Sequence, residues 1–544
     1  MTSTVGRAPA RPRTSGTQGP TRFSGYLGIA GVAFALALAL GAGAGLIASV
    51  ESIDGESVRF DASIWLLCLV GLAPLGVRLW KRRLDPFEPA VWLTLNYLGT
   101  FAGAGFLLSR APHRWHPVLD VDSLTVGVWI VTLGLGAYWL GYCVSPLSRS
   151  ALVLRLVSAL DARFATLRLE LIPVLYVVGL GTRLYLFQAG LYGYLNDRSV
   201  YFDSLGAMQP LYYLEGCTRY ALLLAGLAVF RVNPPRWLVM LFWAMMAAEL
   251  FFGIVSGMKG LVFVNFLLLA MACWYVRKRI PKQLVAVAIV GAFFLLPINT
   301  LYRSAGVTGD FDTRSFFSVV TFLVDSSGRL VSGEISNDLP VEDLFQFNVN
   351  FALERLELLQ NVSLAVALTP EPNEFLSGRY YFMLPALAIV PRAVWPDKPL
   401  MDSGRQFAQR YWGVPESMVM QATAPTNVGD LYMNFGAAGV AVGMLLLGIL
   451  GAGFYALVAQ RPGSGAIFLY TVGFLALTTY ESDLPMIVLS FTRDSLVAVI
   501  VAGLVFRRAE NVSRTMAGGS SPNAASPAVG GGLEAIKTAR APAR

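Results

Sequence analysis

Three prolines stiffen a short segment that carries two cations. Pro391, Pro396 and Pro399 restrict the backbone of the turn that holds Arg392 and Lys398 at fixed places. Arginine binds phosphate oxygens through two parallel hydrogen bonds, and lysine binds them as a point charge. The segment from residue 389 to residue 399 therefore predicts an anion site, for which a pyrophosphate is a good candidate ligand.

Two further cations, Arg405 and Arg410, follow within a dozen residues of this segment. They strengthen the prediction of an anion site, because they concentrate positive charge in one stretch of chain. The alternative is a solvated surface loop whose cations pair with lipid head groups or with Asp397 and Asp402.

Arg183 is an ionisable residue inside an apolar run. An ionised side chain in lipid is costly, so such a residue is a functional candidate by default. Its alternative is a long side chain that extends to the nearby membrane interface.

Histidine and cysteine give no sign of a metal. His113 and His116 are the only histidines, in one short loop without further ligands nearby. The four cysteines lie in or at the ends of apolar runs and lack metal-ligand or redox spacing, which indicates packing residues: Cys68, Cys143, Cys217 and Cys273. The sequence therefore predicts neither a metal nor a cofactor.

Composition places these residues in a membrane protein. Of 544 residues, 55% are hydrophobic and 14% are charged, whereas roughly a quarter of an average soluble domain is charged. The apolar residues form runs of about 20, which can cross the roughly 30 Å hydrocarbon layer as helices. The net charge of +8 comes mostly from short clusters beside these runs, so a nucleic-acid partner is not expected.

Twelve candidate spans follow from these runs, and the fold class expected is an all-α polytopic membrane protein. They cover residues 26–49, 62–80, 89–109, 123–144, 170–190, 211–230, 237–256, 259–276, 283–302, 435–458, 464–480 and 485–506. Clusters of Lys and Arg alternate with acidic loops from end to end, which predicts that both termini are cytoplasmic.

The longest connection runs from residue 303 to residue 434, on the extracytoplasmic side. Its apolar pieces Phe316–Val324 and Tyr381–Val390 are too short to span and predict interfacial or re-entrant helices. The domains expected are a disordered cytoplasmic tail (1–25), a bundle of about nine helices (26–302), an extracytoplasmic cap (303–434), a bundle of about three helices (435–506) and a second disordered cytoplasmic tail (507–544).

Several motifs in order resemble the Wzy-type O-antigen and exopolysaccharide repeat-unit polymerases. They are Pro-Arg-x-x-Trp-Pro-x-Lys-Pro at residues 391–399 and Gly-Asp-Leu-Tyr-x-Asn-Phe-Gly-x-x-Gly at residues 429–439. Upstream, residues 181–198, Ser256–Gly260 and Tyr302-Arg303 are similar to family patterns. Lys259 and Asp430 stand where Arg and Glu are more familiar, and both keep the charge.

The resemblance implies a GT-C-like fold and glycosyl transfer at the outer face of a bacterial inner membrane. Family members join oligosaccharide units carried on undecaprenyl pyrophosphate, and cations stabilise the charge that builds on the departing pyrophosphate. The residues expected to contact it are Arg392, Lys398, Arg303, Lys259, Arg198, Arg183 and Arg405. Asp430 is the first candidate for the general base, with Glu354 second. The alternative for Asp430 is that it caps or anchors the helix that it opens.

The expected partners are the lipid-linked oligosaccharide, membrane lipid, a chain-length regulator and a flippase. Absence of a histidine from the 303–434 loop favours a polymerase over the related ligases. Two other functions stay open. A glycosyltransferase that uses polyprenyl-phosphate sugars would employ the first-loop acids Glu51, Asp54 and Glu56. A lipid-linked oligosaccharide transporter would show internal repeats and charges deep in its spans.

Overall fold

Helices make up most of the structure, a computed structural model. It describes residues 56–509, with gaps at 111, 148–149, 194–207, 232, 281, 309, 333–357, 391–393, 396, 400, 417–421 and 460–461. Within the described residues the strands β1 (Thr166–Leu167) and β2 (Phe506–Arg507) form one short antiparallel pair.

Eight helical segments are long and apolar enough to cross a membrane. Seven are single helices: α2 (Glu56–Trp80), α5 (Val121–Val144), α7 (Leu171–Gln188), α10 (Arg236–Val255), α11 (Lys259–Arg277), α18 (Asn427–Tyr455) and α20 (Leu484–Val505). The eighth runs through α3 (Pro89–Tyr97), the π-helical turn η1 (Leu98–Ala102) and α4 (Gly103–Leu108). The chain is therefore a mostly helical, multi-pass membrane protein, as the composition predicts.

The remaining described helices are shorter or amphipathic, apart from the 27-residue α12. They include η2 (Pro112–Arg114), α6 (Ala151–Arg163), α9 (Cys217–Val229), α12 (Lys282–Thr308), α13 (Phe316–Ser332), α15 (Leu358–Ala367), α16 (Arg379–Ile389), α17 (Ser403–Tyr411) and α19 (Ser464–Leu477). Eleven of the twelve expected spans coincide with helices, and the first, 26–49, lies outside the described residues. Because α9 and α19 have only 13 and 14 residues, the number of spans stays a prediction.

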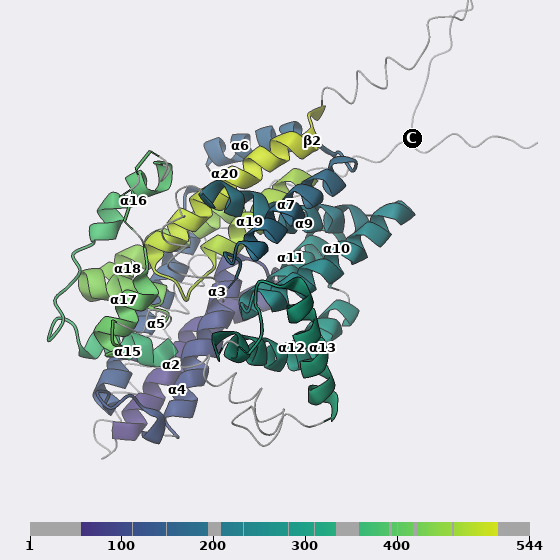
Figure 1. Cartoon of the computed structure of the whole chain (residues 1–544). Coiled ribbons are helices and arrows are strands. Elements are labelled where there is room, and N and C mark those ends of the chain that lie inside the picture. Colours follow the sequence, from purple (N-terminus) through teal and green to yellow (C-terminus); the bar gives the residue numbers. More distant parts are fainter. Residues whose placement is uncertain are drawn as a thin grey trace, which may run out of the picture.

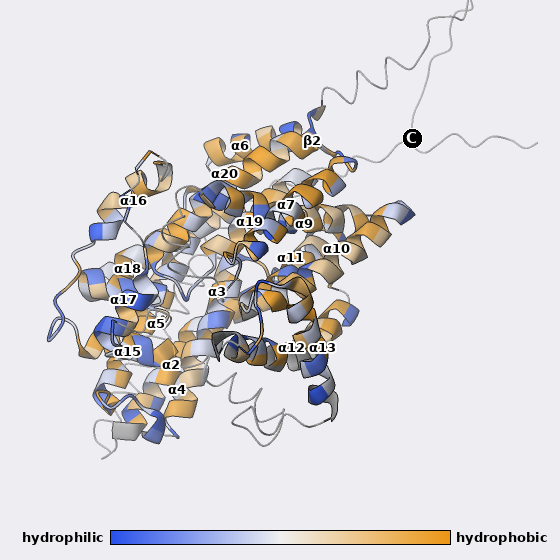
Figure 2. Cartoon of the chain, in the orientation of Figure 1, coloured by the Kyte–Doolittle hydropathy of each residue, from blue (hydrophilic) through white to orange (hydrophobic). Residues whose placement is uncertain are grey.

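The described helices pack into two large hydrophobic cores and a smaller one. The first core joins α2, α3, α5, α15 and α18, and the second joins α9, α10, α11, α19 and α20. The small core joins α7, α10, α12 and α13. Figure 1 shows the two large groups side by side, with α3 and α19 between them. In Figure 2 hydrophobic colours dominate the long helices, whereas hydrophilic residues gather around α15, α16 and α17.

Small residues allow α5 and α18 to lie in backbone contact. A Cβ on Gly141 would meet the carbonyl oxygen of Leu445 at 2.0 Å, and one on Gly448 would meet that of Tyr138 at 2.1 Å. Such contacts are typical of membrane helices, where close backbone packing replaces the hydrophobic effect as the source of association.

Gly436 interrupts α18. Its φ of 65° and ψ of −161° lie outside the helical region and in one that favours glycine. The chain therefore turns sharply after a first helical segment that contains Asp430. This first segment begins at Asn427, inside the stretch expected to belong to the 303–434 loop.

Four described helices, α13, α15, α16 and α17, belong to that loop. The apolar pieces expected to form short helices do so in α13 and α16. α15 was not expected: its residues 359–365 are all buried, and a Cβ on Gly127 of α5 would meet Ser363 Oγ at 2.2 Å. One part of the long loop is therefore packed into the first core.

Candidate functional sites

A small cavity surrounds Asp430, where α16 and α17 cover the first segment of α18 and the start of α20. Its volume is about 80 Å³. A cavity needs about 10–15 Å³ of such space to hold one water molecule, so this one has room for a hydroxyl group and several waters. The polar residues lining it include Asp430, Asp483, Ser403, Gln406, Arg410, Asn434, Tyr380 and Tyr381. We call this space the Asp430 cavity.

Asp430 is buried, and both of its carboxylate oxygens accept hydrogen bonds. Oδ1 accepts from Asn434 Nδ2 at 3.0 Å. Oδ2 accepts from the hydroxyl of Tyr381 and from the backbone N–H of Leu484 at 3.2 Å. The side chain thus links α18, α16 and the start of α20.

Thr426, and not Asp430, caps the first segment of α18. The Thr426 Oγ1 accepts from Gly429 N at 3.0 Å. Helix capping therefore does not account for the position of Asp430. Its observed contacts anchor α16 and the start of α20, and they are compatible with a role as general base.

Asp483 is a second acid on the same cavity. Its Oδ1 accepts from Met486 N at 2.7 Å and caps α20, and its Oδ2 accepts from Ser403 Oγ of α17. Burial raises the pKa of Asp483 above its usual range. Burial and the nearby Asp430 also raise the pKa of Tyr381, so this tyrosine stays protonated and acts as a donor.

Lys398 and Arg405 lie in the 303–434 loop, but they do not line the Asp430 cavity. Lys398 Nζ donates to the carbonyl oxygens of Leu387 at 2.6 Å and Val390 at 3.0 Å, at the end of α16 opposite Tyr381. Arg405 of α17 pairs at 2.9 Å with Asp402, the residue that precedes this helix. This is one of the pairings expected for a solvated loop.

Other candidate residues are scattered or lie outside the described residues. Arg303 is half-buried in α12, and Lys259 is the first residue of α11. Arg392, Arg198 and Glu354 fall in the gaps of the description, so the anion site at residues 389–399 stays a prediction.

Arg183 lies at the centre of a buried ionic cluster. Its Nε donates to Glu215 at 2.7 Å, its Nη1 to Glu249 at 2.7 Å, and its Nη2 to Thr218. The side chains of Arg183 and Glu249 are each 2% exposed, so Arg183 does not extend to the interface. With each of its nitrogens occupied by a protein acceptor, it holds α7 to α9 and α10.

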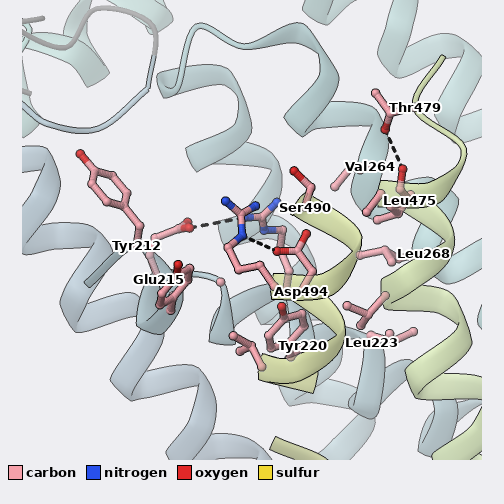
Figure 3. Close-up of a pocket in the computed structure, with 17 residues that line it drawn as sticks. Tyr212, Glu215, Tyr220, Leu223, Val264, Leu268, Leu475, Thr479, Ser490 and Asp494 are labelled. Atoms are coloured by element: carbon pink, nitrogen blue, oxygen red, sulfur yellow. Dashed lines mark hydrogen bonds and ion pairs between the residues drawn. The ribbon is translucent and has the colours of Figure 1, made fainter. Parts of the chain in front are cut away.

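A larger cavity, of about 420 Å³, adjoins this cluster. It lies among the start of α9, α11, α19 and α20, and we call it the arginine cavity because Arg219 and Arg493 line it. In Figure 3 dashed lines join the side-chain nitrogens in the middle of the cavity to the carboxylates of Glu215 and Asp494.

Sequence reasoning missed the polar residues of the arginine cavity, although the signal was present. Arg493 and Asp494 stand in the middle of the apolar helix α20, and Arg219 follows Glu215 in another apolar stretch. Charges within a span are functional candidates. Arg183 is therefore only one of several ionisable residues that lie inside apolar stretches of this chain.

These features define a multi-pass helical membrane protein with two polar cavities. Residues 198–461 match a family model described as a domain of unknown function, DUF8712. No curated protein and no solved structure matches the chain. The matched region includes Asp430 and Arg219 but neither Asp483 nor Arg493.

Proposed function

We propose that this protein is a polymerase that joins undecaprenyl-pyrophosphate-linked oligosaccharide units into a polysaccharide at the outer face of the bacterial inner membrane. The observation that carries the proposal is the burial of Asp430 in a cavity beneath α16 and α17, beside a second acid and Arg410. The ordered motifs around residues 391–399 and 429–439 support the same function. A GT-C-like bundle of about twelve spans with both termini in the cytoplasm belongs to this proposal.

In the proposed reaction Asp430 removes the proton from the accepting hydroxyl of the incoming unit. The hydroxyl oxygen attacks the anomeric carbon of the growing chain as the bond from that carbon to the pyrophosphate oxygen breaks. The electron pair of this bond leaves with the pyrophosphate, whose charge Arg392, Lys398 and Arg303 stabilise, with Lys259 and Arg198 as further contacts. The proton passes from Asp430 to solvent.

Asp430 suits the base role better than Asp483 because its hydrogen bonds are easier to exchange. Asp483 fixes the amide of Met486 at the start of α20, a contact on which the fold of that helix depends. At Asp430 the hydroxyl of Tyr381 can be replaced by a substrate hydroxyl if α16 moves.

The test is the lipid-linked glycan profile of a deletion strain that carries wild type, Asp430→Asn, Arg392→Ala or the control Asp120→Asn. Asp120 caps α5 at an exposed position away from both cavities. We expect single units to accumulate at the outer face in the deletion strain, and only wild type and the control to restore polymer. Long polymer on the lipid carrier in the deletion strain would exclude polymerisation.

A second candidate function is transport of a lipid-linked oligosaccharide. The charged residues inside the apolar helices favour it, since transporters place such groups along the substrate path. Arg493 and Asp494 of α20 are the clearest instance. The same strain separates the two functions, because a lost transporter leaves single units at the inner face, where an enzyme added to the outside cannot reach them.

A further inference from the structure

The lining of the arginine cavity changes from polar to apolar along three of its walls, and its fourth wall, α11, contributes only the apolar Val264 and Leu268. On α20 the lining residues run from Ser490 through Arg493 and Asp494 to Val497. Two further walls show the same order, with Glu215, Arg219 and Leu223 on the segment that runs into α9, and Thr479, Leu475 and Val472 on α19. All polar ends lie toward the start of α20, so the cavity suits an amphipathic ligand whose head lies at that end.

The arginines of the cavity keep hydrogen-bond donors to spare. Arg493 donates to Asp494 through Nε at 2.9 Å, and neither of its Nη groups bonds to a described residue. Arg219 has one long bond, from Nη2 to Glu215 at 3.4 Å. Since each guanidinium has five N–H donors, the cavity offers an acceptor-rich group several unused donors from two directions.

The charges of the cavity and its neighbouring cluster balance. Three arginines face three acids: Arg183, Arg219 and Arg493 against Glu215, Glu249 and Asp494. A purely anionic ligand would leave one of these acids without a counter-charge at low dielectric, which is costly. A ligand that carries both signs would preserve the balance.

Surrounding lipid can reach the cavity from the side. The side chains of Arg493 and Asp494 are 41% and 33% exposed, and Leu496 and Ile500 of the same helix are exposed large apolar residues. The cavity thus opens beside a surface of α20 that faces hydrocarbon in a membrane protein. Tyr213, whose ring lies 5.9 Å from the Arg493 guanidinium, stands at its polar end.

We propose that the arginine cavity binds the head group of a zwitterionic phospholipid, with the phosphate on Arg219 and Arg493 and the ammonium on Asp494. The phosphate oxygens accept the unused guanidinium N–H groups, and the ammonium donates to the carboxylate that Arg493 then shares. The acyl chains lie along the apolar wall formed by Leu223, Leu268, Val472 and Val497. This site is independent of glycosyl transfer at Asp430.

Native mass spectrometry of the delipidated full-length protein, titrated with phosphatidylethanolamine, phosphatidylglycerol and phosphatidylcholine, tests the proposal. Wild type is expected to retain phosphatidylethanolamine most tightly, because phosphatidylglycerol lacks an ammonium and phosphatidylcholine has no N–H to donate. Arg493→Gln should weaken this binding about tenfold, the effect of a lost charge-assisted hydrogen bond. Arg236→Gln, at the exposed start of α10, is the matched control and should leave it unchanged.

Asp494→Asn gives the sharper result, because it leaves the cavity with one excess positive charge. The preferred lipid should then change from phosphatidylethanolamine to phosphatidylglycerol. Tighter binding of phosphatidylglycerol by wild type, or the same preference in wild type and Asp494→Asn, would overturn the proposal. So would unchanged phosphatidylethanolamine binding by an Arg493→Gln protein that elutes as wild type in gel filtration.

Discussion

The hydroxyl of Tyr381 donates a hydrogen bond to the carboxylate of Asp430, across 49 residues of chain. This contact joins α16 to the first segment of α18, which ends at the turn made by Gly436. A movement of α16 must therefore break or replace one of the hydrogen bonds that hold the candidate base.

Tyr381→Phe should loosen the cap without removing the base. We expect the melting temperature of the purified protein to fall, because a hydrogen bond to a charged acceptor contributes about 1.5–3 kcal/mol. Tyr380→Phe is the control, since the Tyr380 hydroxyl only accepts a long bond of 3.4 Å from Gln406 at an exposed position. Equal effects of the two variants would show that the Tyr381 contact does not hold α16.

Asp483→Asn should change how stability depends on pH. Burial raises the native pKa of Asp483, so the native state holds this proton more tightly than the unfolded chain does. The contribution to stability is then complete below the unfolded-state pKa and is lost as the pH rises through the native pKa. We expect the melting temperature of Asp483→Asn, relative to wild type, to increase as the pH rises above about 4, the pKa of an exposed aspartate. A difference that stays constant as the pH rises would contradict the burial argument.

The sequence predicted the helical class and the positions of many helices, because an apolar run of membrane length has few possible structures other than a helix. The motif at residues 429–439 and its family resemblance also selected Asp430. The sequence could not find Tyr381, which donates to Asp430, or the pair of Ser403 and Asp483 in the same cavity, because these contacts join distant segments. The burial of α15 could not be predicted either, since a ten-residue segment that contains Gln360, Asn361 and Ser363 is too short and too polar to indicate a span. Arg493 and Asp494 could have been found from their place in an apolar run.

Glu249→Ala should be strongly destabilising. The pair Arg183–Glu249 is buried on both sides, and removing one partner of such a pair leaves an uncompensated charge, at a cost of about 3–5 kcal/mol. Glu170→Ala is the control, because Glu170 pairs with Arg507 at 3.3 Å on an exposed surface, where a pair contributes about 0–1 kcal/mol. The yield of folded protein and its melting temperature measure the effect of each substitution. Similar values for the two variants would mean that Arg183 finds another acceptor.

Gly448→Ala tests the backbone contact between α5 and α18. The new methyl group would meet the carbonyl oxygen of Tyr138 at 2.1 Å, so the helices must separate, at a cost of about 1–3 kcal/mol for overpacking. Gly136→Ala on α5 is the control, because its nearest neighbour there is Val70 at 4.0 Å. Since α5 and α18 also enclose α15, the separation should expose the buried loop segment, and protease cleavage within residues 358–367 should increase in Gly448→Ala alone. If Gly448→Ala resists the protease as well as wild type does, then α18 can shift without disturbing α15.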